Sequence, residues 1–278
     1  IADAAQHGNW YPDSFKRLRT KIGEMYDLGP DNVALCNGSS ETIDAMMRIF
    51  MQPGEEIIMS TPTFELFPVR AELCGCKAVQ IPLRAGDLQY DVDGMLNAIT
   101  DKTKLLLVIN PNNPTGVFID DDDLIRFCET GIPLCIDEAY AAYTPERKTK
   151  APLIKKYPHV FLSVTLSKAH GFAGIRFGFV LGCEEMIKAF NTMFLPWNVS
   201  LMSAAAAEAI FDHPAEVEAK VSAASMSELD AWARRIMASR DASLGAGQNL
   251  WLSFLFRTST DMTATAGRAI ITTINGTG

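Results

Sequence analysis

Seven short apolar segments, spaced through the first two thirds of this 278-residue chain, constrain its fold more than any other feature. Each is continuous and rich in branched or aromatic residues, which is typical of strands covered on both faces. They are residues 32–38, 55–60, 77–82, 104–110, 132–138, 159–167 and 176–182. Helix-like segments lie between several of them, at residues 40–51, 91–100 and 119–130. This alternation predicts an α/β fold with an open, mostly parallel sheet and helices on both faces.

The pattern changes after Pro196. Residues 198–211 and 214–240 are rich in alanine and predict two helices, the second of them long. Residues 248–257 and 268–274 are strand-like. We therefore predict a large α/β domain at residues 1–205 and a smaller α+β domain at residues 206–278.

The composition excludes several classes of partner. The chain is 48% hydrophobic, which is enough for a sizeable core. Its net charge is −8 and its 25 Lys and Arg residues are scattered, so it lacks the basic stripe that nucleic acid or an anionic membrane requires. No apolar run reaches bilayer-spanning length, and the first residues lack the order of a signal peptide. We expect a cytoplasmic protein with no nucleic-acid and no membrane partner.

Cysteine and histidine spacing predicts neither a disulfide framework nor a metal site. The six cysteines lie mostly in apolar stretches, which favours reduced thiols in a chain of this length. The four histidines are far apart and form no recognised ligand pair. The acidic run at residues 120–123 could ligate a metal, but carboxylates in the first turn of a helix also complement its dipole. We favour the helix interpretation.

Polar clusters follow four of the predicted strands. They are "GSSE" at 38–41, "NPNNPTG" at 110–116, "DEAY" at 137–140 and "SK" at 167–168. In open α/β sheets, ligands bind at the carboxyl ends of the strands, because the loops that leave parallel strands converge there. Four clusters with chemically useful side chains therefore predict a ligand site at this edge.

The "GSSE" cluster opens a predicted helix and has two interpretations. Small residues there leave backbone N–H groups free at the positive end of the helix dipole, which suits a phosphate. Alternatively, Ser39 or Ser40 simply caps the helix. Arg176, eight residues after Lys168, could add a planar cation to the same phosphate, or it could face solvent.

Lys168 and Asp137 each follow an apolar strand, and the chemistry of each side chain there depends on the groups that lie beside it. An amine in an apolar setting near another cation is nucleophilic and forms Schiff bases. A buried carboxylate must find a cation or hydrogen-bond donor, and a pyridinium nitrogen is one such partner. Pyridoxal phosphate requires this set of groups: a lysine, an acid against the ring nitrogen and a phosphate site.

The ordered motifs resemble those of fold-type I aminotransferases of class I and II, and within that group the chain is most similar to histidinol-phosphate aminotransferases. The resemblance runs from "NWYPD" at 9–13 through "NGSSE", "TPTF", "NPNNPTG" and "DEAY" to "TLSKAHGFAGIRFG", which ends at residue 178. It implies the aspartate aminotransferase-like fold and pyridoxal 5′-phosphate (PLP) as the cofactor. The implied partners are a small-molecule amino donor and a 2-oxo acid.

The resemblance also implies roles for individual residues. Lys168 would form the Schiff base with PLP and then move the proton between the substrate's α-carbon and the cofactor. Asp137 would keep the pyridine nitrogen protonated. Asn113 and Tyr140 would hydrogen-bond the ring's 3-oxygen. Phe64, in "TPTF", would stack on the ring, with a plain core phenylalanine as the alternative.

The remaining implied contacts concern the phosphate and the partner subunit. The phosphate cup would comprise Ser39, Ser40, Thr165, Ser167 and Arg176. Tyr11, in "NWYPD", would reach the phosphate of a neighbouring subunit, so that the active enzyme is a homodimer with shared sites.

The chain departs from the family pattern at both ends. Family members begin with an N-terminal arm, and this chain starts just before "NWYPD", so we expect the arm to be missing. The family's substrate-carboxylate arginine directly precedes an "ITxG"-like strand, where this chain has Ile270 or Ile271. Arg268 is then the candidate for this role, with a surface arginine as the alternative. The segment before Arg268 is also short, so we expect an incomplete small domain.

Three functional hypotheses follow from these residues. The first is transamination between an amino acid-like donor, such as L-histidinol phosphate, and a 2-oxo acid such as 2-oxoglutarate, with ping-pong kinetics. The second is a decarboxylase of the threonine-phosphate type, or a lyase, on the same fold. The third is a domain that binds PLP without turnover.

Overall fold

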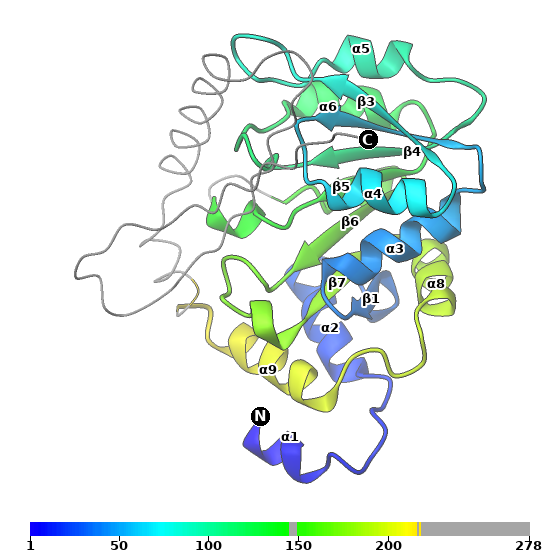
Figure 1. Ribbon diagram of the computed structural model, residues 1–278. Helices are drawn as coiled ribbons and strands as arrows, with labels where there is room; N and C mark the ends of the chain where they lie inside the picture. The colour runs from blue at the N-terminus through cyan, green and yellow to red at the C-terminus, as the bar shows by residue number, and fades with distance from the viewer. Residues whose placement is uncertain (145–148, 216, 218–278) are drawn as a thin grey trace, which may run out of the picture.

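The computed structural model describes residues 1–144, 149–215 and 217, and each of the seven predicted strands is present. The strands are β1 (Val33–Cys36), β2 (Glu56–Thr61), β3 (Lys77–Pro82), β4 (Thr103–Ile109), β5 (Leu134–Asp137), β6 (Val160–Thr165) and β7 (Gly178–Leu181). They form one sheet in the order β1-β7-β6-β5-β4-β2-β3 (Figure 1). The apolar runs are strands because a sheet between two helical layers buries most of their side chains.

The sheet is mostly parallel, as predicted. Pairs β2–β3, β2–β4, β4–β5 and β5–β6 are parallel. Strand β7 is antiparallel to both of its neighbours, β6 and β1. All strands except β7 therefore run in one direction, and the amino end of β7 lies at the same edge as the carboxyl ends of the others.

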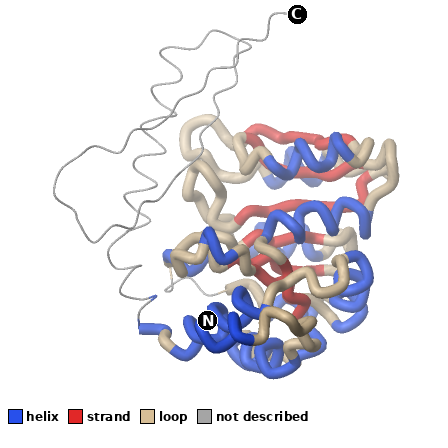
Figure 2. Tube along the Cα trace, turned by 60° about the horizontal axis from the view of Figure 1, so that its bottom comes forward, coloured by secondary structure: helices blue, strands red, loops and turns tan. Residues whose placement is uncertain are grey.

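Helices cover both faces of the sheet (Figure 2). Side chains of α3 (Ser39–Phe50), α4 (Leu66–Leu73) and α8 (Glu184–Met193) pack into the core on one face. The other face is covered by α2 (Lys16–Met25), α5 (Val92–Asn97), α6 (Asp121–Cys128), α7 (Pro152–Lys156) and α9 (Leu201–Asp212). The short N-terminal α1 (Ala2–Gln6) lies beside α9. Two apolar layers with the sheet between them hold the strand ends, and thus their loops, in fixed places.

The expectation that every strand is covered on both faces is wrong for β3. This strand lies at the edge of the sheet, and the residues of β3 are exposed or half-buried. The structure also contains α2, α4, α7 and α8, which sequence patterning did not reveal. The run at residues 120–123 begins α6, with three Asp residues in its first turn, which confirms the helix interpretation.

All six cysteines are free thiols, as predicted. Among the described residues, no helix is both long enough and apolar enough to cross a bilayer. Helix α9 confirms the helix predicted at residues 198–211 and continues across the boundary proposed at residue 205. The longer helix at 214–240 and the strands at 248–257 and 268–274 lie outside the described residues, apart from a few positions at the start of the helix. The division into two domains remains a prediction.

Candidate active site

A cavity at the carboxyl edge of the parallel strands brings most of the predicted site residues together. Ten of its lining residues were named from the sequence, and Ile43, Ile109 and Ala139 were not. The ten are Ser39, Ser40, Phe64, Asn113, Asp137, Tyr140, Thr165, Ser167, Lys168 and Arg176. They come from loops after five different strands, so the cavity depends on the sheet rather than on one local motif.

The start of α3 forms the part of the cavity that suits an anion. The helix begins at Ser39, and Gly38, with a φ of +74°, is its N-cap; no side chain caps it. The alternative in which Ser39 or Ser40 caps the helix is therefore wrong. Both serines line the cavity instead. The first N–H groups of a helix lack intrahelical partners and lie at the positive end of its dipole, so this end suits a phosphate.

Arg176 lies directly against this helix start. It follows a 3₁₀ turn (Ala173–Ile175), and its Nη1 donates to the Ser167 hydroxyl at 3.3 Å and to the Ala173 carbonyl at 3.0 Å. A Cβ atom at Gly38 would lie 2.4 Å from the Arg176 Nη2. Glycine at position 38 therefore supplies both the left-handed backbone and the space for the guanidinium. Thr165 donates from Oγ1 to Ser167 Oγ at 3.0 Å, which joins the hydroxyls to the same cluster.

Asp137 is a buried carboxylate at the floor of the cavity. It ends β5 and is only 4% exposed, and the Ala139 N–H donates to its Oδ1 at 3.0 Å. Burial raises the pKa of Asp137 to about 6, because the charged form loses its hydration; the Ala139 hydrogen bond and the charge of Lys168 oppose this shift. A cationic donor entering the cavity would therefore be held strongly by this group.

Lys168 lies in the turn that follows β6. The strand ends at Thr165, two residues earlier than predicted, and the chain turns with a hydrogen bond from the Gly171 N–H to the Lys168 carbonyl at 2.8 Å. The Lys168 Nζ lies 4.9 Å from the centre of the Tyr140 ring. Its amine therefore faces an aromatic wall in the cavity that also contains Asp137.

Phe64 and Asn113 enter the cavity from two loops that are tied together. The Asn112 side chain, which the sequence analysis missed, donates to the Pro62 carbonyl at 3.1 Å and accepts from the Thr63 hydroxyl at 3.3 Å. Phe64 is 38% exposed, so the core alternative for this residue is wrong. A flat ligand could lie against its ring.

A further residue that sequence reasoning missed fixes the loop before α9. The Asn198 amide donates to the Leu35 carbonyl at 3.1 Å and to Glu41 Oε2 at 2.7 Å, and the Asn37 N–H donates to the same oxygen at 2.6 Å. The Glu41 carboxylate is thereby engaged next to the anion-binding helix start. No short motif marks Asn198, because its partners are far away in the sequence.

Among the described residues predicted for the site, Tyr11 does not line the cavity. It is 75% exposed, and its ring lies 4.3 Å from that of Trp197, between centroids. The residue proposed to clamp the substrate carboxylate, Arg268, lies outside the described residues.

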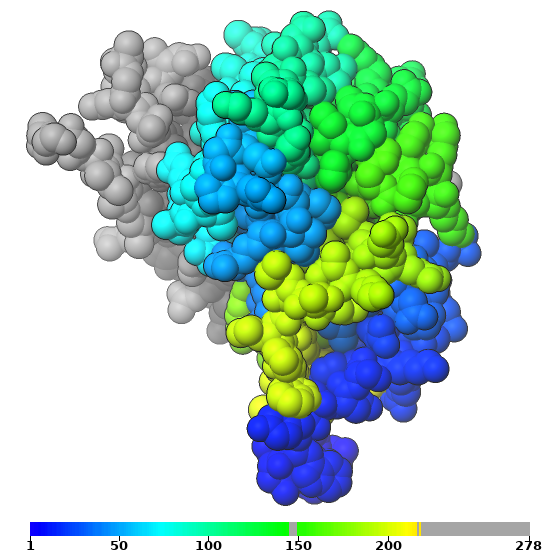
Figure 3. Space-filling model, turned by 90° about the vertical axis from the view of Figure 1, so that its right-hand side faces the viewer, coloured from blue at the N-terminus to red at the C-terminus, as the bar shows by residue number. Residues whose placement is uncertain are grey.

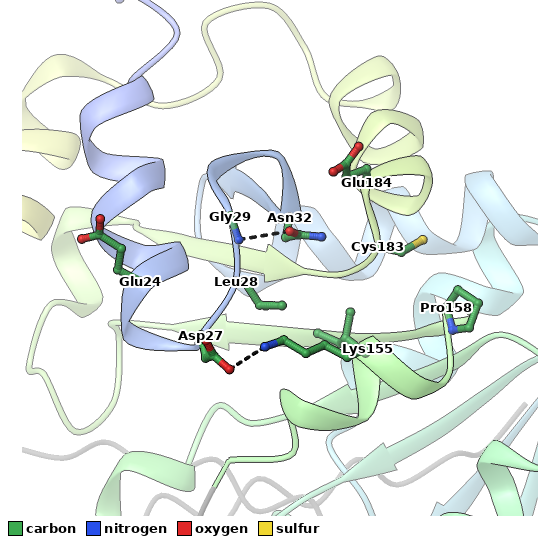
Figure 4. A pocket seen from close by; sticks show the side chains of 10 residues that line it. Glu24, Asp27, Leu28, Gly29, Asn32, Lys155, Pro158, Cys183 and Glu184 are labelled. Carbon is green, nitrogen blue, oxygen red and sulfur yellow. Dashed lines mark hydrogen bonds and ion pairs between the residues drawn. The ribbon is translucent and has the colours of Figure 1, made fainter.

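A larger hollow of about 770 Å³ lies at the opposite edge of the sheet (Figure 4). It is bordered by Asn32, Pro158 and Cys183, which flank the amino ends of β1 and β6 and the carboxyl end of β7. Asp27 and Lys155 form an ion pair at its rim. None of the residues predicted for the site lies there, so the chemistry of the lining, and not the size of the hollow, identifies the site.

Solved structures place the fold. The histidinol-phosphate aminotransferase from Clostridium acetobutylicum superposes with a TM-score of 0.72 at 25% identity, covering 80% of this chain and 66% of that one. The histidinol-phosphate aminotransferase from Sinorhizobium meliloti, solved in complex with PLP, gives 0.72 at 24% identity, covering 79% and 61%. The fold is that of the aspartate aminotransferase-like PLP enzymes.

Sequence comparison is more specific. The chain is 36% identical over 217 residues to histidinol-phosphate aminotransferase 1 of Idiomarina loihiensis, covering 76% of this chain and 59% of that one. It is 32% identical over 229 residues to the aromatic amino acid aminotransferase of Corynebacterium jeikeium, covering 80% and 61%. Residues 2–246 match the family model of aminotransferases of class I and II. The chain belongs to this family, and it spans about three fifths of the length of these curated relatives.

The family uses PLP, and the described residues fit it. The buried carboxylate of Asp137 matches a ring nitrogen that carries a proton. The uncapped start of α3, together with Arg176, matches a phosphate, and the Lys168 amine matches an aldehyde. Each match rests on a feature of the cavity: the raised pKa of Asp137, a helix start with a glycine N-cap and no side-chain cap, and an amine against an aromatic ring.

The raised pKa of Asp137 can be tested through the pH dependence of stability, in protein from which PLP and other small molecules have been removed. The folded protein binds this proton more tightly than the unfolded chain, whose pKa is near 3.8. The contribution to the free energy of unfolding is therefore fully present below pH 4 and is lost as the pH rises through 6, by roughly 3 kcal/mol. We expect Asp137→Asn to gain stability relative to the wild type over this range, measured by urea unfolding.

The control is Asp3→Asn, which changes an exposed carboxylate. It serves as the reference for removing a carboxylate from the surface. A stability difference between Asp137→Asn and the wild type that stays constant between pH 4 and pH 7.5 would contradict the assigned burial cost.

Proposed function

We propose that this chain carries the PLP-binding site of an aminotransferase, which moves an amino group from an amino acid-like donor, with L-histidinol phosphate as the first candidate, to a 2-oxo acid such as 2-oxoglutarate. The observation that carries the proposal is the convergence of Lys168, Asp137 and the start of α3 on one cavity. Relatives named histidinol-phosphate aminotransferase support the choice of donor, and those named aromatic amino acid aminotransferase supply a second class to test. The scattered charge and free thiols support a cytoplasmic setting.

Each residue of the cavity is assigned a role according to where it lies. When bound, PLP supplies an electron-poor ring that stabilises negative charge at the substrate's α-carbon. Asp137, buried and anionic, accepts the hydrogen bond of the ring nitrogen and keeps its proton in place. Lys168 would hold the aldehyde, and its amine, once the substrate's amino group has displaced it, would move a proton at the α-carbon. Asn113 and Tyr140 orient the ring through its 3-oxygen, while Phe64 stacks on its face.

The phosphate is assigned to the cluster around the start of α3. Ser39 and Ser40 offer hydroxyls and backbone N–H groups, and Arg176 offers a fixed planar cation that Gly38 leaves room for. Thr165 and Ser167 complete the cup from the loop after β6. Anchoring the phosphate holds the ring between Asp137 and Lys168, so that the orientation does not have to be found anew in each turnover.

We also propose that the active form is a homodimer in which Tyr11 reaches the phosphate site of the partner. Tyr11 and Trp197 form an exposed aromatic pair, and Trp10 and Leu195 nearby in sequence are 62% and 74% exposed. The N-terminal segment and the chain before α9 lie together at one end of the molecule (Figure 3). Large apolar residues gathered on a surface are typical of an interface.

Reduction with borohydride tests the lysine. Borohydride reduces the linkage between a lysine amine and the PLP aldehyde to a stable bond. If Lys168 forms this linkage, we expect PLP to label Lys168 alone, with one label per chain. Lys168→Ala should lose the label, whereas Lys155→Ala, which removes an exposed lysine at the opposite edge, should keep it. Peptide mapping by mass spectrometry reads the result. A label on another residue, or undiminished labelling of Lys168→Ala, would overturn the assignment.

A single half-reaction tests the chemistry. Mixing the PLP form with L-histidinol phosphate, without a 2-oxo acid, should convert the cofactor to its pyridoxamine form and release a keto product. Lys168→Ala should slow this conversion by about 100-fold or more, because the proton-transfer group is gone. Aromatic amino acids form the comparison series of donors. Release of carbon dioxide from an aromatic amino acid, or of ammonia from either kind of donor, in place of a keto product would point to a decarboxylase or lyase.

Mixed dimers test the role of Tyr11. Tyr11→Ala should bind PLP about tenfold more weakly, because one hydrogen bond to the phosphate is lost. Lys168→Ala lacks activity but keeps Tyr11. If the sites are shared, mixing the two variants restores sites that contain both residues, and activity rises above the sum of the separate proteins. Strict additivity, or a monomer in sedimentation velocity, would count against the shared dimer.

A further inference from the structure

Gly178 occupies a crowded backbone position beside the proposed phosphate cup. It is the first residue of β7, and it pairs with Cys36 of β1 on one side and with Thr165 of β6 on the other. Each of these neighbours is the last residue of its strand. Beyond Cys36 the chain enters Gly38 and the start of α3, and beyond Thr165 it enters Ser167 and Lys168. Gly178 therefore separates the two halves of the proposed phosphate cup.

The space around Gly178 does not admit a side chain. A Cβ there would lie 2.7 Å from the carbonyl oxygen of Val164, 3.1 Å from Cys36 Sγ and 3.1 Å from the backbone nitrogen of Ser39. Two of these atoms belong to the main chain, so rotation of a side chain cannot relieve the contacts. The backbone of Gly178 lies outside the left-handed region, so alanine is excluded by space and not by conformation.

We propose that Gly178 is a positioning residue for the cofactor's phosphate. Its missing side chain lets the start of α3 approach the end of β6, and this approach sets the distance between the Ser39 N–H and the Thr165–Ser167–Arg176 cluster. The inference rests on the proposed function, because it concerns the same cup. A methyl group at 178 pushes Ser39 away from the cluster, so that one phosphate can no longer be bound well by both halves.

The consequence is specific to the phosphate. PLP and pyridoxal share the ring and the aldehyde, so both can use Asp137 and Lys168, whereas only PLP uses the cup. A shift of the cup therefore weakens PLP binding much more than pyridoxal binding. A general loss of stability would weaken both ligands alike.

The experiment compares the affinities of the full chain for PLP and pyridoxal by absorbance titration, together with thermal unfolding. Gly178→Ala should lower the preference for PLP over pyridoxal by about tenfold or more, as expected when charge-assisted hydrogen bonds are lost.

The matched control is Gly182→Ala, at the other end of β7. There a Cβ would meet the Met186 side chain at 3.0 Å and 3.2 Å, so this position is also crowded, but it is far from the cup along the strand. This variant should lose stability and keep the wild-type preference to within about twofold.

If Gly178→Ala does not fold, the double variant Cys36→Ala/Gly178→Ala replaces it. Removing the sulfur relieves one of the three contacts and leaves the two main-chain contacts in place, so the double variant must still show a lower preference for PLP than Gly182→Ala.

The outcomes separate the two proposals. An unchanged preference in the folded Gly178 variant, or an equal loss in Gly182→Ala, would overturn the positioning role alone. If the wild type itself binds pyridoxal as tightly as PLP, the phosphate cup of the proposed function is wrong.

Discussion

A carboxylate buried at the end of β5 is the constraint on which the site depends. Asp137 is almost entirely excluded from water, and the Ala139 N–H, the Ser163 hydroxyl and the Lys168 charge lower its pKa by less than burial raises it. A group in this condition stabilises whichever cation is brought to it. The fold therefore keeps in the cavity a carboxylate whose burial favours a cationic partner, and a protonated pyridine nitrogen would be such a partner.

The sheet brings the other residues of the candidate site to the same edge. Because all strands but β7 point the same way, the loops after β1, β2, β4, β5 and β6 open at one edge, where the first turn of α3 presents backbone N–H groups. Two glycines allow the segments at this edge to pack closely. Gly38 leaves room for the Arg176 guanidinium, and Gly178 leaves room for the start of α3. The residues that react and the residues that set their spacing are thus different, and only the former carry functional groups.

The sequence predicted the parts of the molecule that depend on local pattern. Buried strands appear as apolar runs, and ten site residues could be named because the motifs at the ends of those runs resemble the motifs of a known family. Strand β3 was misjudged because an apolar run does not reveal that it lies at an edge. Helix α4 was missed because Pro68 interrupts its pattern, although proline is tolerated in a first helical turn. The helix start at Ser39 was left open between capping and anion binding, since only the structure shows that Gly38 is the cap. Asn112, Asn198 and Gly178 were out of reach, because their importance lies in contacts with residues distant in the sequence.

The central claim is that Asp137 keeps the ring nitrogen of bound PLP protonated. The most direct measurement is the ¹⁵N chemical shift of PLP labelled at that nitrogen, bound to the full chain and followed between pH 6 and pH 9. We predict the shift of a protonated pyridine throughout this range in the wild type and of an unprotonated one in Asp137→Asn. The same shift in both proteins, or a wild-type nitrogen that loses its proton as free PLP does, would contradict the account.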